Sequence, residues 1–573
     1  MFTFSNAVEA GGMRTLSLPP QGSALHTPAA LGGYDLVWAL APETLRAQLS
    51  GLQKAGKLPS EVLVGNLEEA GLVIGGEAAD RVRLAVPQLT LDAGAPRGAS
   101  LELLFTSGNM SYYDGVGQRG NVLKQSVAGW KLTFNVKLQL EPVALTEAMQ
   151  DAGPDCARAL MRFDETRYRL HALALDFDHS DLMHADPART HLGTDNKVLA
   201  GNFANFIGAW LKGLAEAGTP FVLGYAAVRA IPGEDALSKL QAGSVSVAAA
   251  GTLNLLHMLG RKASTDGRGA AGGPGLAALR PGYAPGCAAR AVLSREVFFK
   301  RFLKPLLIDP IQQRLTQLPD YRNLRVAPDG ALNREESFNE KSGVSATMDN
   351  GARAVFVPNA SGWGYRDHVL LHWREGNRLS HVRESEQDLQ FSVTLSSQPD
   401  VMGVPRLTVD LYSSLMRYEW DRASQKMALF NRKVNLGKGW ARSTMHWAMR
   451  LQFLADDHGA IRVAVTPKRS PAATDSGVVG MYMVSDALGH LLNMNKLSNE
   501  WEGNPASLAA LQQEVVAGFG EAATALFDQM AGQLVLPSGP QPGCRRVQLN
   551  EDGNIELDLG WYCLLYTSPS PRD

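Results

Sequence analysis

The chain has 573 residues, and a length above about 250 to 300 residues favours two lobes or one elongated body over a single compact core. Its formal net charge is -2 at pH 7 and its lysines and arginines are dispersed, which excludes the basic stripe that nucleic acid demands. The four cysteines stand far apart without a CxxC pair, so we expect a reducing compartment and neither a zinc ribbon nor a disulfide scaffold.

Residues 1–31 have weak periodicity and are predicted to form a flexible N-terminal arm. They lack the basic start and the apolar run of a conventional signal peptide. The most apolar segment, Val245–Leu259, is too short to span a bilayer. We therefore expect a soluble protein, cytoplasmic on synthesis or released without a conventional signal peptide, whose membrane contact is at most peripheral.

The first lobe is assigned to residues 32–325. It opens with the apolar segment GYDLVWAL at 33–40, followed by a helix from Pro42 to about Gly56 with leucines at i, i+4 and i+7. Alternation of apolar and polar residues then predicts a series of strands. These strands are expected at 81–86, 88–91, 101–105, 168–177 and 221–230.

The clearest strand is Trp130–Leu140, in which apolar and polar residues alternate without a break. Trp130, Phe134 and Leu138 fall on its apolar face, which must cover something apolar while water wets the other face. At about 3.3 Å per residue the strand reaches on the order of 35 Å. The pattern predicts a sheet that wraps an apolar partner.

Three amphipathic helices are candidates for that partner. The first, at 202–217, has one broad apolar stripe, formed by Phe203, Phe206, Ile207, Trp210, Leu211 and Leu214. The second follows a Ser294 N-cap, with Pro305 expected to kink or end it; its α-helical stripe is Phe298, Phe299, Phe302, Leu303, Leu306 and Leu307. The third spans 504–532 and begins with Asn504 as cap and Pro505 at the first helical position.

The Gly-, Ala- and Pro-rich segment 264–286 is predicted to be a mobile loop, and the polar residues 319–345 suggest the boundary to a second lobe at 326–562. In that lobe we expect a strand at 406–412, a turn at 421–426 between two short strands, and a pair of strands at 443–454 and 461–466. A final hairpin follows the last helix. Strands in runs with a few long helices indicate an α+β fold with antiparallel sheet.

The segment DFDHSDLMHADPARTH at 176–191 contains oxygen and imidazole groups that could hold a divalent metal, chiefly Asp176, Asp178, His179 and His184. Its spacing fits neither HExxH nor the EF-hand loop, so an acidic, solvated loop at a strand end is the favoured interpretation. The chain has no GxSxG elbow and no cysteine in a catalytic signature. We expect no enzymatic activity and no cofactor.

Five segments in this order carry a family resemblance: GYDLVWAL and its helix, AGTLNLLHML, LSREVFFKRFLKPLL, RLTVDLYSSLMRYEWDRASQKMAL and the C-terminal helix. Together they resemble the forty-seven-kilodalton and OrfX accessory proteins of clostridial neurotoxin-type gene clusters, over about Gly33 to Trp561. The resemblance implies a TULIP (tubular lipid-binding) fold, in which a long, curved antiparallel sheet wraps long helices and leaves an apolar groove. It implies no catalytic residues.

Three functions are therefore considered. The first is non-enzymatic binding of a lipid or other long apolar ligand, in a groove lined by the apolar residues of the Trp130 strand and of the first two helices. The second is a structural accessory role, in which the same fold is packed solid and binds partner proteins of a toxin-type complex. The third is a metal-dependent enzyme using the 176–191 segment.

The segment Cys563–Asp573, CLLYTSPSPRD, matches the translation of a transposase-type sequencing-library adapter residue for residue. We expect it to be an artefact rather than part of the natural protein, which removes Cys563 from the cysteine count.

Overall fold

The structure of the protein is a computed structural model. It describes residues 31, 35–92, 97–114, 120–150, 152–163, 168–216, 221–229, 240–247, 253–259, 287–310, 345–350, 356–359, 362–377, 381–399, 403–427, 432–456, 459–469, 473–479, 504–539 and 541–561. The predicted arm up to residue 30, the 264–286 loop, the boundary at 325 and 326, and the segment 563–573 lie outside these residues.

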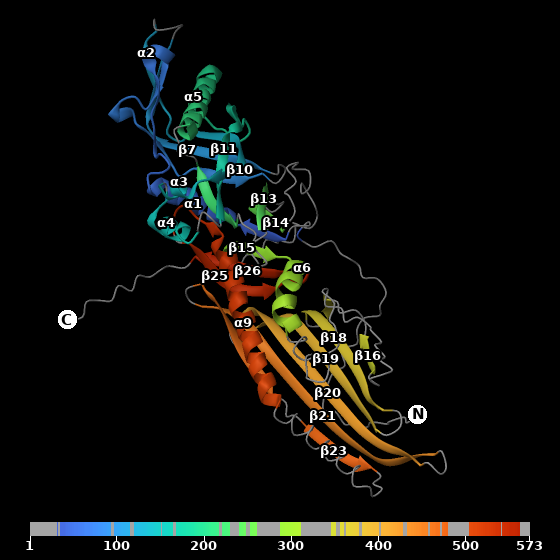
Figure 1. Cartoon of the computed structure of the whole chain (residues 1–573). Coiled ribbons are helices and arrows are strands. Elements are labelled where there is room, and N and C mark those ends of the chain that lie inside the picture. Colours follow the sequence, from blue (N-terminus) through green and yellow to red (C-terminus); the bar gives the residue numbers. More distant parts are fainter. Residues whose placement is uncertain are drawn as a thin grey trace, which may run out of the picture.

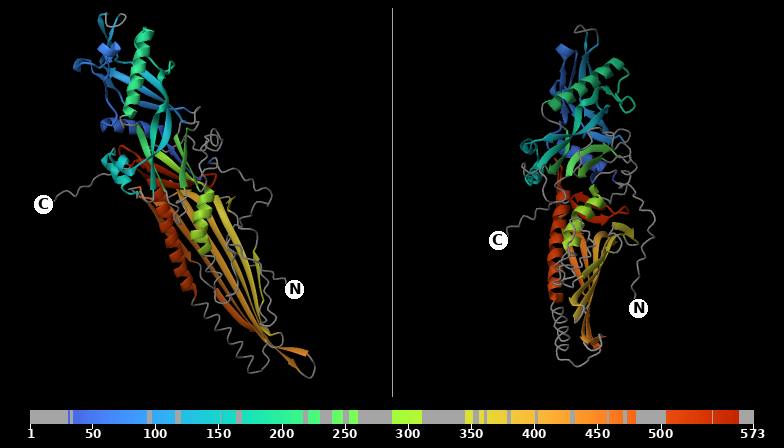
Figure 2. Two further views of the ribbon diagram at one scale, coloured as in Figure 1. Left: turned by 45° about the horizontal axis from the view of Figure 1, so that its top comes forward. Right: turned by 45° about the vertical axis from the view of Figure 1, so that its right-hand side comes forward.

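The described elements form an elongated body with helix α5 (Lys197–Glu216) toward one end and a long curved sheet at the other (Figures 1 and 2). The ladders that join its strands are antiparallel. The α+β class predicted from runs of strands and a few long helices is confirmed.

The upper sheet has the order β2-β5-β7-β10-β11-β12-β24, with β6 beside β7. Its strands are β2 Glu61–Val62, β5 Val82–Leu84, β6 Gln88–Leu91, β7 Gly98–Ser107, β10 Lys131–Val143, β11 Tyr168–Ala185, β12 Val222–Arg229 and β24 Leu534–Val535. The tip sheet beside it has the order β3-β4-β8-β9. Its elements are β3 Val64–Asn66, α2 Leu67–Ala70, β4 Leu72–Ile74, the short η1 turn Ala78–Asp80, β8 Asn109–Tyr113 and β9 Val122–Ser126.

The central sheet joins the two ends of the described chain. Its order is β13-β14-β1-β15-β26-β25, with β1 Leu36–Leu40, β13 Leu240–Val247, β14 Leu253–Leu259, β15 Cys287–Leu293, β25 Pro542–Leu549 and β26 Ile555–Trp561. A charged cluster lies within it: Asp558 Oδ1 accepts from Arg290 Nε at 2.6 Å, and Asp558 Oδ2 accepts from Arg546 Nε at 2.8 Å. Because Arg290 and Asp558 are buried, these bonds offset the cost of removing their charges from water.

The long sheet has the order β16-β18-β19-β20-β21-β22, with β17 beside β18 and β23 beside β21. Its strands are β16 Ser345–Asn350, β17 Phe356–Asn359, β18 Gly362–Asn377, β19 His381–Pro399, β20 Pro405–Met427, β21 Arg432–Ala455, β22 Ile461–Arg469 and β23 Ala473–Val479. Helix α9 (Asn504–Gly532) runs beside it (Figure 2). The predicted turn at 421–426 is wrong, because β20 continues through these residues, which pair with β21 from Lys433 to Gly439.

The remaining helices cover the other sheets. They are α1 Pro42–Lys54, α3 Leu145–Gln150, α4 Pro154–Leu160, α6 Arg295–Val297 and the π-helix η4 Phe298–Ile308. Helix α1 begins at Pro42 as predicted and buries Leu45, Leu49 and Leu52. Ser294 caps α6 as predicted, because its side chain accepts from the Val297 N–H at 3.3 Å.

Candidate functional site

Helix α5 carries six of the candidate groove residues, and it starts earlier than its apolar stripe indicates. Asn196 caps it, since its side-chain oxygen accepts from the N–H groups of Val198 and Leu199, each at 3.1 Å. The first turns therefore lie before Asn202, where the sequence pattern placed the start.

Half of the α5 stripe anchors the helix to the sheet. Phe203, Ile207 and Leu211 are fully buried. The Phe203 ring meets Phe105 of β7 and Trp130 edge-on, with centroids 5.1 Å and 4.9 Å away. Edge-to-face contacts of this kind add about 0.5–1.5 kcal/mol to simple burial. These side chains form the core between α5 and the upper sheet.

Strand β10 supplies the facing surface. Trp130 precedes it, and Phe134 and Leu138 lie within it; all three are buried, while Asn135 and Lys137 are exposed. The predicted alternation therefore holds, with Thr133 as the exception. Thr133 lies on the predicted wet face but is 1% exposed, because residues 186–191 fold over it and its Oγ1 donates to the Arg189 carbonyl at 3.2 Å.

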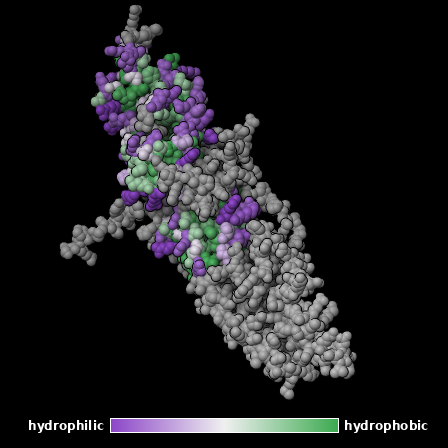
Figure 3. Space-filling view, in the orientation of Figure 1, coloured by the Kyte–Doolittle hydropathy of each residue, from purple (hydrophilic) through white to green (hydrophobic). Residues whose placement is uncertain are grey.

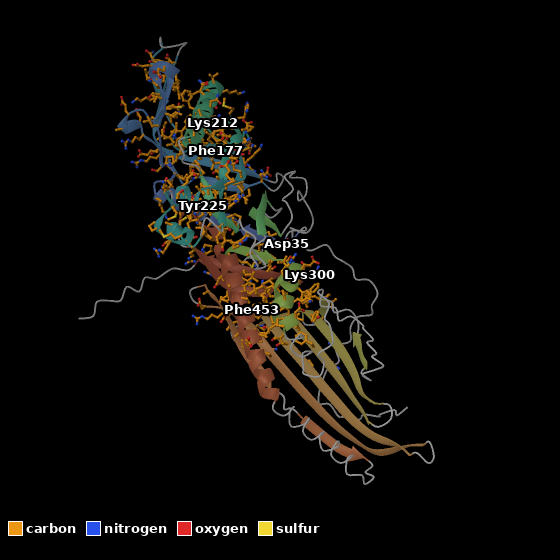
Figure 4. All side chains as sticks on the ribbon, viewed as in Figure 1. Asp35, Phe177, Lys212, Tyr225, Lys300 and Phe453 are labelled. Atoms are coloured by element: carbon orange, nitrogen blue, oxygen red, sulfur yellow. The ribbon has the colours of Figure 1, made fainter. Side chains whose placement is uncertain are left out.

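Helix α5 approaches β11 closely at one residue. A Cβ atom on Gly208 would overlap the backbone carbonyl oxygen of Leu182. The register of β11 against β10 shifts twice in this region, near Asn135. These bulges bring Phe177 and Leu182 into the core. Phe177, which is labelled in Figure 4, packs edge-on against Phe221 with 5.1 Å between ring centroids.

The other half of the stripe forms a partly exposed flank of α5, which we call the α5 flank. Phe206, Trp210 and Leu214 repeat at i, i+4 and i+8, and each is only partly buried against the core. Phe206 reaches β3, since a Cβ on Gly65 would meet its ring. Gly213 lies beside the flank, one turn from Trp210, and a Cβ there would meet nothing within 4 Å. Figure 3 shows apolar side chains at the molecular surface in the part that contains the upper and tip sheets.

The second group of candidate residues lies on η4, at the top of the long sheet. The ring of Phe298 stacks with Phe527 of α9 at 6.2 Å, and Phe302 lies 5.4 Å from Phe519 of the same helix. Phe453 of β21, which is labelled in Figure 4, packs edge-on against Phe527 with 5.3 Å between ring centroids. Phe298 and Phe302 are therefore packed against α9, which in turn contacts the long sheet through Phe527 and Phe453.

Leu306 does not lie on the buried side of η4, which corrects the predicted stripe. It is 39% exposed, whereas Leu307 and Ile308 are fully buried. The reason is the i→i+5 bonding of a π-helix, which lengthens each turn beyond the 3.6 residues of an α-helix. The buried pairs therefore repeat every four to five residues, at 298–299, 302–303 and 307–308. Pro305 lies inside the helix instead of ending it.

Comparison with known proteins gives structural matches only. No protein-family model matches the chain, and no curated protein sequence matches it. The chain is similar in structure to P47. P47 of Clostridium botulinum E1 is 11% identical with a TM-score of 0.40, covering 92% of this chain and 99% of that one. P47 from Clostridium botulinum A2 is 10% identical with a TM-score of 0.37, covering 93% and 98%.

A lipopolysaccharide binding protein matches as well, at 10% identity and a TM-score of 0.25, over 92% of this chain and 98% of that one. In the described part of the chain, no helix is long and apolar enough to cross a membrane.

The predicted metal-binding residues lie on β11, which continues to Ala185, and not in a loop beyond a strand. Asp176 accepts from His179 and Asp181 from His184, with ring nitrogen to carboxylate distances of 2.9 Å and 3.0 Å. The two pairs serve as local caps of the bulges, since each aspartate also accepts the histidine backbone N–H. Asp178 belongs to neither pair, and the described residues contain no group of three or more ligands placed for a metal ion.

Sequence reasoning missed two features of this region. Gly208 and Gly213 decide where α5 touches the sheet and where its flank stays open, yet a glycine in a helix pattern gives no signal of either role. The Asn196 cap could have been found, because an asparagine two residues before an apolar repeat is a recognised start signal.

Proposed function

We propose that the protein is a non-enzymatic, TULIP-like protein that binds a lipid or another long apolar ligand along the α5 flank. The observation that carries this proposal is the division of the α5 stripe. Three residues fasten the helix to the sheet, and Phe206, Trp210 and Leu214 remain partly exposed in a row. Phe203, Ile207 and Leu211 are enough to hold α5 on the sheet. The α5 flank is therefore available for an apolar ligand.

The size and chemistry of the flank suit an acyl chain. Eight residues of helix span about 12 Å at 1.5 Å per residue. Burial of a methylene group is worth about 0.8 kcal/mol, so a chain segment of this length gains appreciable free energy from apolar contact alone. The positions beside the flank on its open side, Ala209 and Gly213, are exposed and small, and leave room above Trp210.

The experiment is titration with cis-parinaric acid, a fluorescent fatty acid that accepts excitation energy from tryptophan. We expect saturable energy transfer from the wild-type chain and a clearly weaker signal from Trp210→Phe, which removes the nearest donor while keeping the flank apolar. Native mass spectrometry with organic extraction then tests for co-purified lipid. A clean mass together with no parinaric acid uptake would sink the ligand proposal.

A matched pair of glycine variants separates blocking from unfolding. Gly213→Leu fills the open space beside Trp210, whereas Gly201→Leu adds the same side chain to the same helix away from the flank. A Cβ at either glycine meets nothing within 4 Å, so both variants should fold. We expect uptake to fall only for Gly213→Leu. Equal uptake by the two variants would place the ligand elsewhere.

The packed core favours a second candidate, a structural accessory protein that binds partner proteins. Phe203, Trp130 and Phe134 are buried, and the rings of Trp130 and Phe203 are in contact, as a solid scaffold requires. Trp210→Asp distinguishes the two candidates. Under the ligand proposal it abolishes uptake with a small loss of melting temperature, because Trp210 is partly exposed. A large loss of stability in a chain that takes up no lipid would favour the scaffold.

A further inference from the structure

Strand β9 forms one edge of the tip sheet, at the end of the molecule away from the long sheet (Figure 1). It pairs with β8 on one side, from Tyr113↔Val122 to Asn109↔Ser126. Among the described strands none pairs with its other side. An edge of this kind presents a row of backbone donors and acceptors to solvent.

Two hydrogen bonds beyond the ends of β9 establish which backbone groups are open. Val127 N–H donates to the Gly108 carbonyl at 3.1 Å, and Asp114 N–H donates to the Asn121 carbonyl at 3.0 Å. Hydrogen-bonded pairs alternate in an antiparallel ladder, so the odd-numbered residues of β9 bond to β8. The N–H and C=O groups of Val122 and Lys124 therefore point away from β8, toward the open side.

The side chains of this edge are apolar where a protected edge would be charged. Val122 is 50% exposed on one face and Leu123 is 40% exposed on the other. The one charge of the strand, Lys124, is tied back: its Nζ lies 2.7 Å from Asp80 Oδ2. A lysine that projects from an edge normally discourages pairing, and here that lysine is occupied within its own molecule.

We propose that β9 pairs antiparallel with β9 of a second copy of this chain, in the register Val122 opposite Lys124 of the second copy. The twofold axis then passes between the two Leu123 residues, and the two tip sheets become one continuous sheet. The N–H and C=O groups of Val122 bond with those of Lys124 in the second copy, and those of Lys124 bond with Val122 in the second copy. This proposal is independent of the α5 flank and of any ligand bound there.

The register follows from charge and from the ladder. The even-numbered residues face the open side, so a twofold axis through any residue of the strand pairs open groups with open groups. An axis at residue 122 or 126 leaves only one such pair within the strand. An axis at residue 125 places two glutamines at the centre and gives no apolar contact there. An axis at residue 124 would place two lysines directly opposite each other, which is unfavourable. An axis at Leu123 places two leucines in the non-hydrogen-bonded pair, where side chains approach most closely. A strand of five residues forms a small contact, below the roughly 1,200 Å² of stable interfaces, so the dimer is weak.

Disulfide trapping tests the register. In a non-hydrogen-bonded pair the two Cα atoms lie about 4.5 Å apart, within the range of a disulfide. We expect Leu123→Cys to form a disulfide-linked dimer under mild oxidation. Gln125→Cys lies on the same face but about 13 Å from its counterpart, and should stay unlinked. Equal cross-linking of the two variants would overturn the proposed register.

Sedimentation equilibrium tests the pairing itself through the micromolar range. We expect a reversible monomer–dimer equilibrium for the wild type and a shift to monomer for Val122→Pro. Proline removes an N–H that β8 does not use, and it is tolerated at an edge strand, so the melting temperature should be nearly unchanged. A wild-type chain that stays monomeric, or a Val122→Pro variant that dimerises as the wild type does, would overturn the proposal.

Discussion

Gly208 controls how closely α5 lies on β11. Gly208→Ala is expected to destabilise the fold by about 1–3 kcal/mol, because the added methyl would press on the Leu182 carbonyl and push the helix away. Gly201→Ala, in the same helix with nothing within 4 Å, should instead stabilise it by about 0.5–1 kcal/mol. Thermal unfolding followed by circular dichroism measures both. Melting shifts of the same sign would contradict this account of the contact.

Asp80 links strands β8 and β9 of the tip sheet through hydrogen bonds whose strength depends on pH. Hydrogen bonds from Lys124 and Asn109 lower the pKa of its carboxyl below the ordinary 3.8. A lowered carboxyl pKa stabilises the folded state above pH 3.8, and this contribution is lost as the pH falls through the lowered value. Asp80→Asn should therefore be less stable than the wild type at neutral pH.

The difference between Asp80→Asn and the wild type should narrow in acid below pH 3.8, when measured as urea midpoints at a series of pH values. Glu77→Gln is the control, because Glu77 is well exposed and lies 3.8 Å from the Lys124 ammonium group. A difference in urea midpoint that stays constant with pH would show that Asp80 acts through packing and not through its charge.

At the scale of elements, the π-helix η4 decides which residues reach the core. Ile308→Ala is expected to cost about 2–5 kcal/mol, because Ile308 is fully buried. Leu306→Ala should change stability by no more than about 0.5 kcal/mol, because Leu306 is 39% exposed. Chemical denaturation of the two variants gives the comparison. The opposite order would mean that this segment is α-helical in solution.

Several elements were predictable from local pattern alone. The β25–β26 hairpin has its turn where NEDGN stands in the sequence, and β21 pairs with β22 up to Ala455 opposite Ile461 as expected. The extension of β20 through 421–426 was not predictable, because those residues look like a polar turn. Pairing along β21 stabilises them as a strand, and a pattern within one segment carries no information about such a neighbour.

At the scale of the whole molecule, the last strands complete sheets that begin near the start of the described chain. β24 pairs with β12 of the upper sheet, and β26 pairs with β15 of the central sheet. Ile555, Leu557 and Leu559 of β26 are fully buried. The upper and central sheets therefore depend on strands from the C-terminal part of the described chain.

A chain that stops after residue 533 should fail to fold, because it leaves the buried edges of β12 and β15 without partners. The matched control stops after residue 561 and loses only the segment beyond β26; it should melt like the full chain. Limited proteolysis and near-ultraviolet circular dichroism of the two proteins provide the measurement. A protected, cooperative 1–533 chain would refute the proposed dependence.

The sequence alone determined that α5 is a helix and β10 a strand, and which face of each is apolar. It identified the stripe of Phe203 to Leu214 and the alternation from Trp130 to Leu140, because periodicity depends only on neighbours along the chain. Tertiary structure decided what covers each face: Phe203 is buried by Phe105 and Trp130, whereas Trp210 stays partly exposed. That choice rests on contacts between residues far apart in sequence, which no local pattern records.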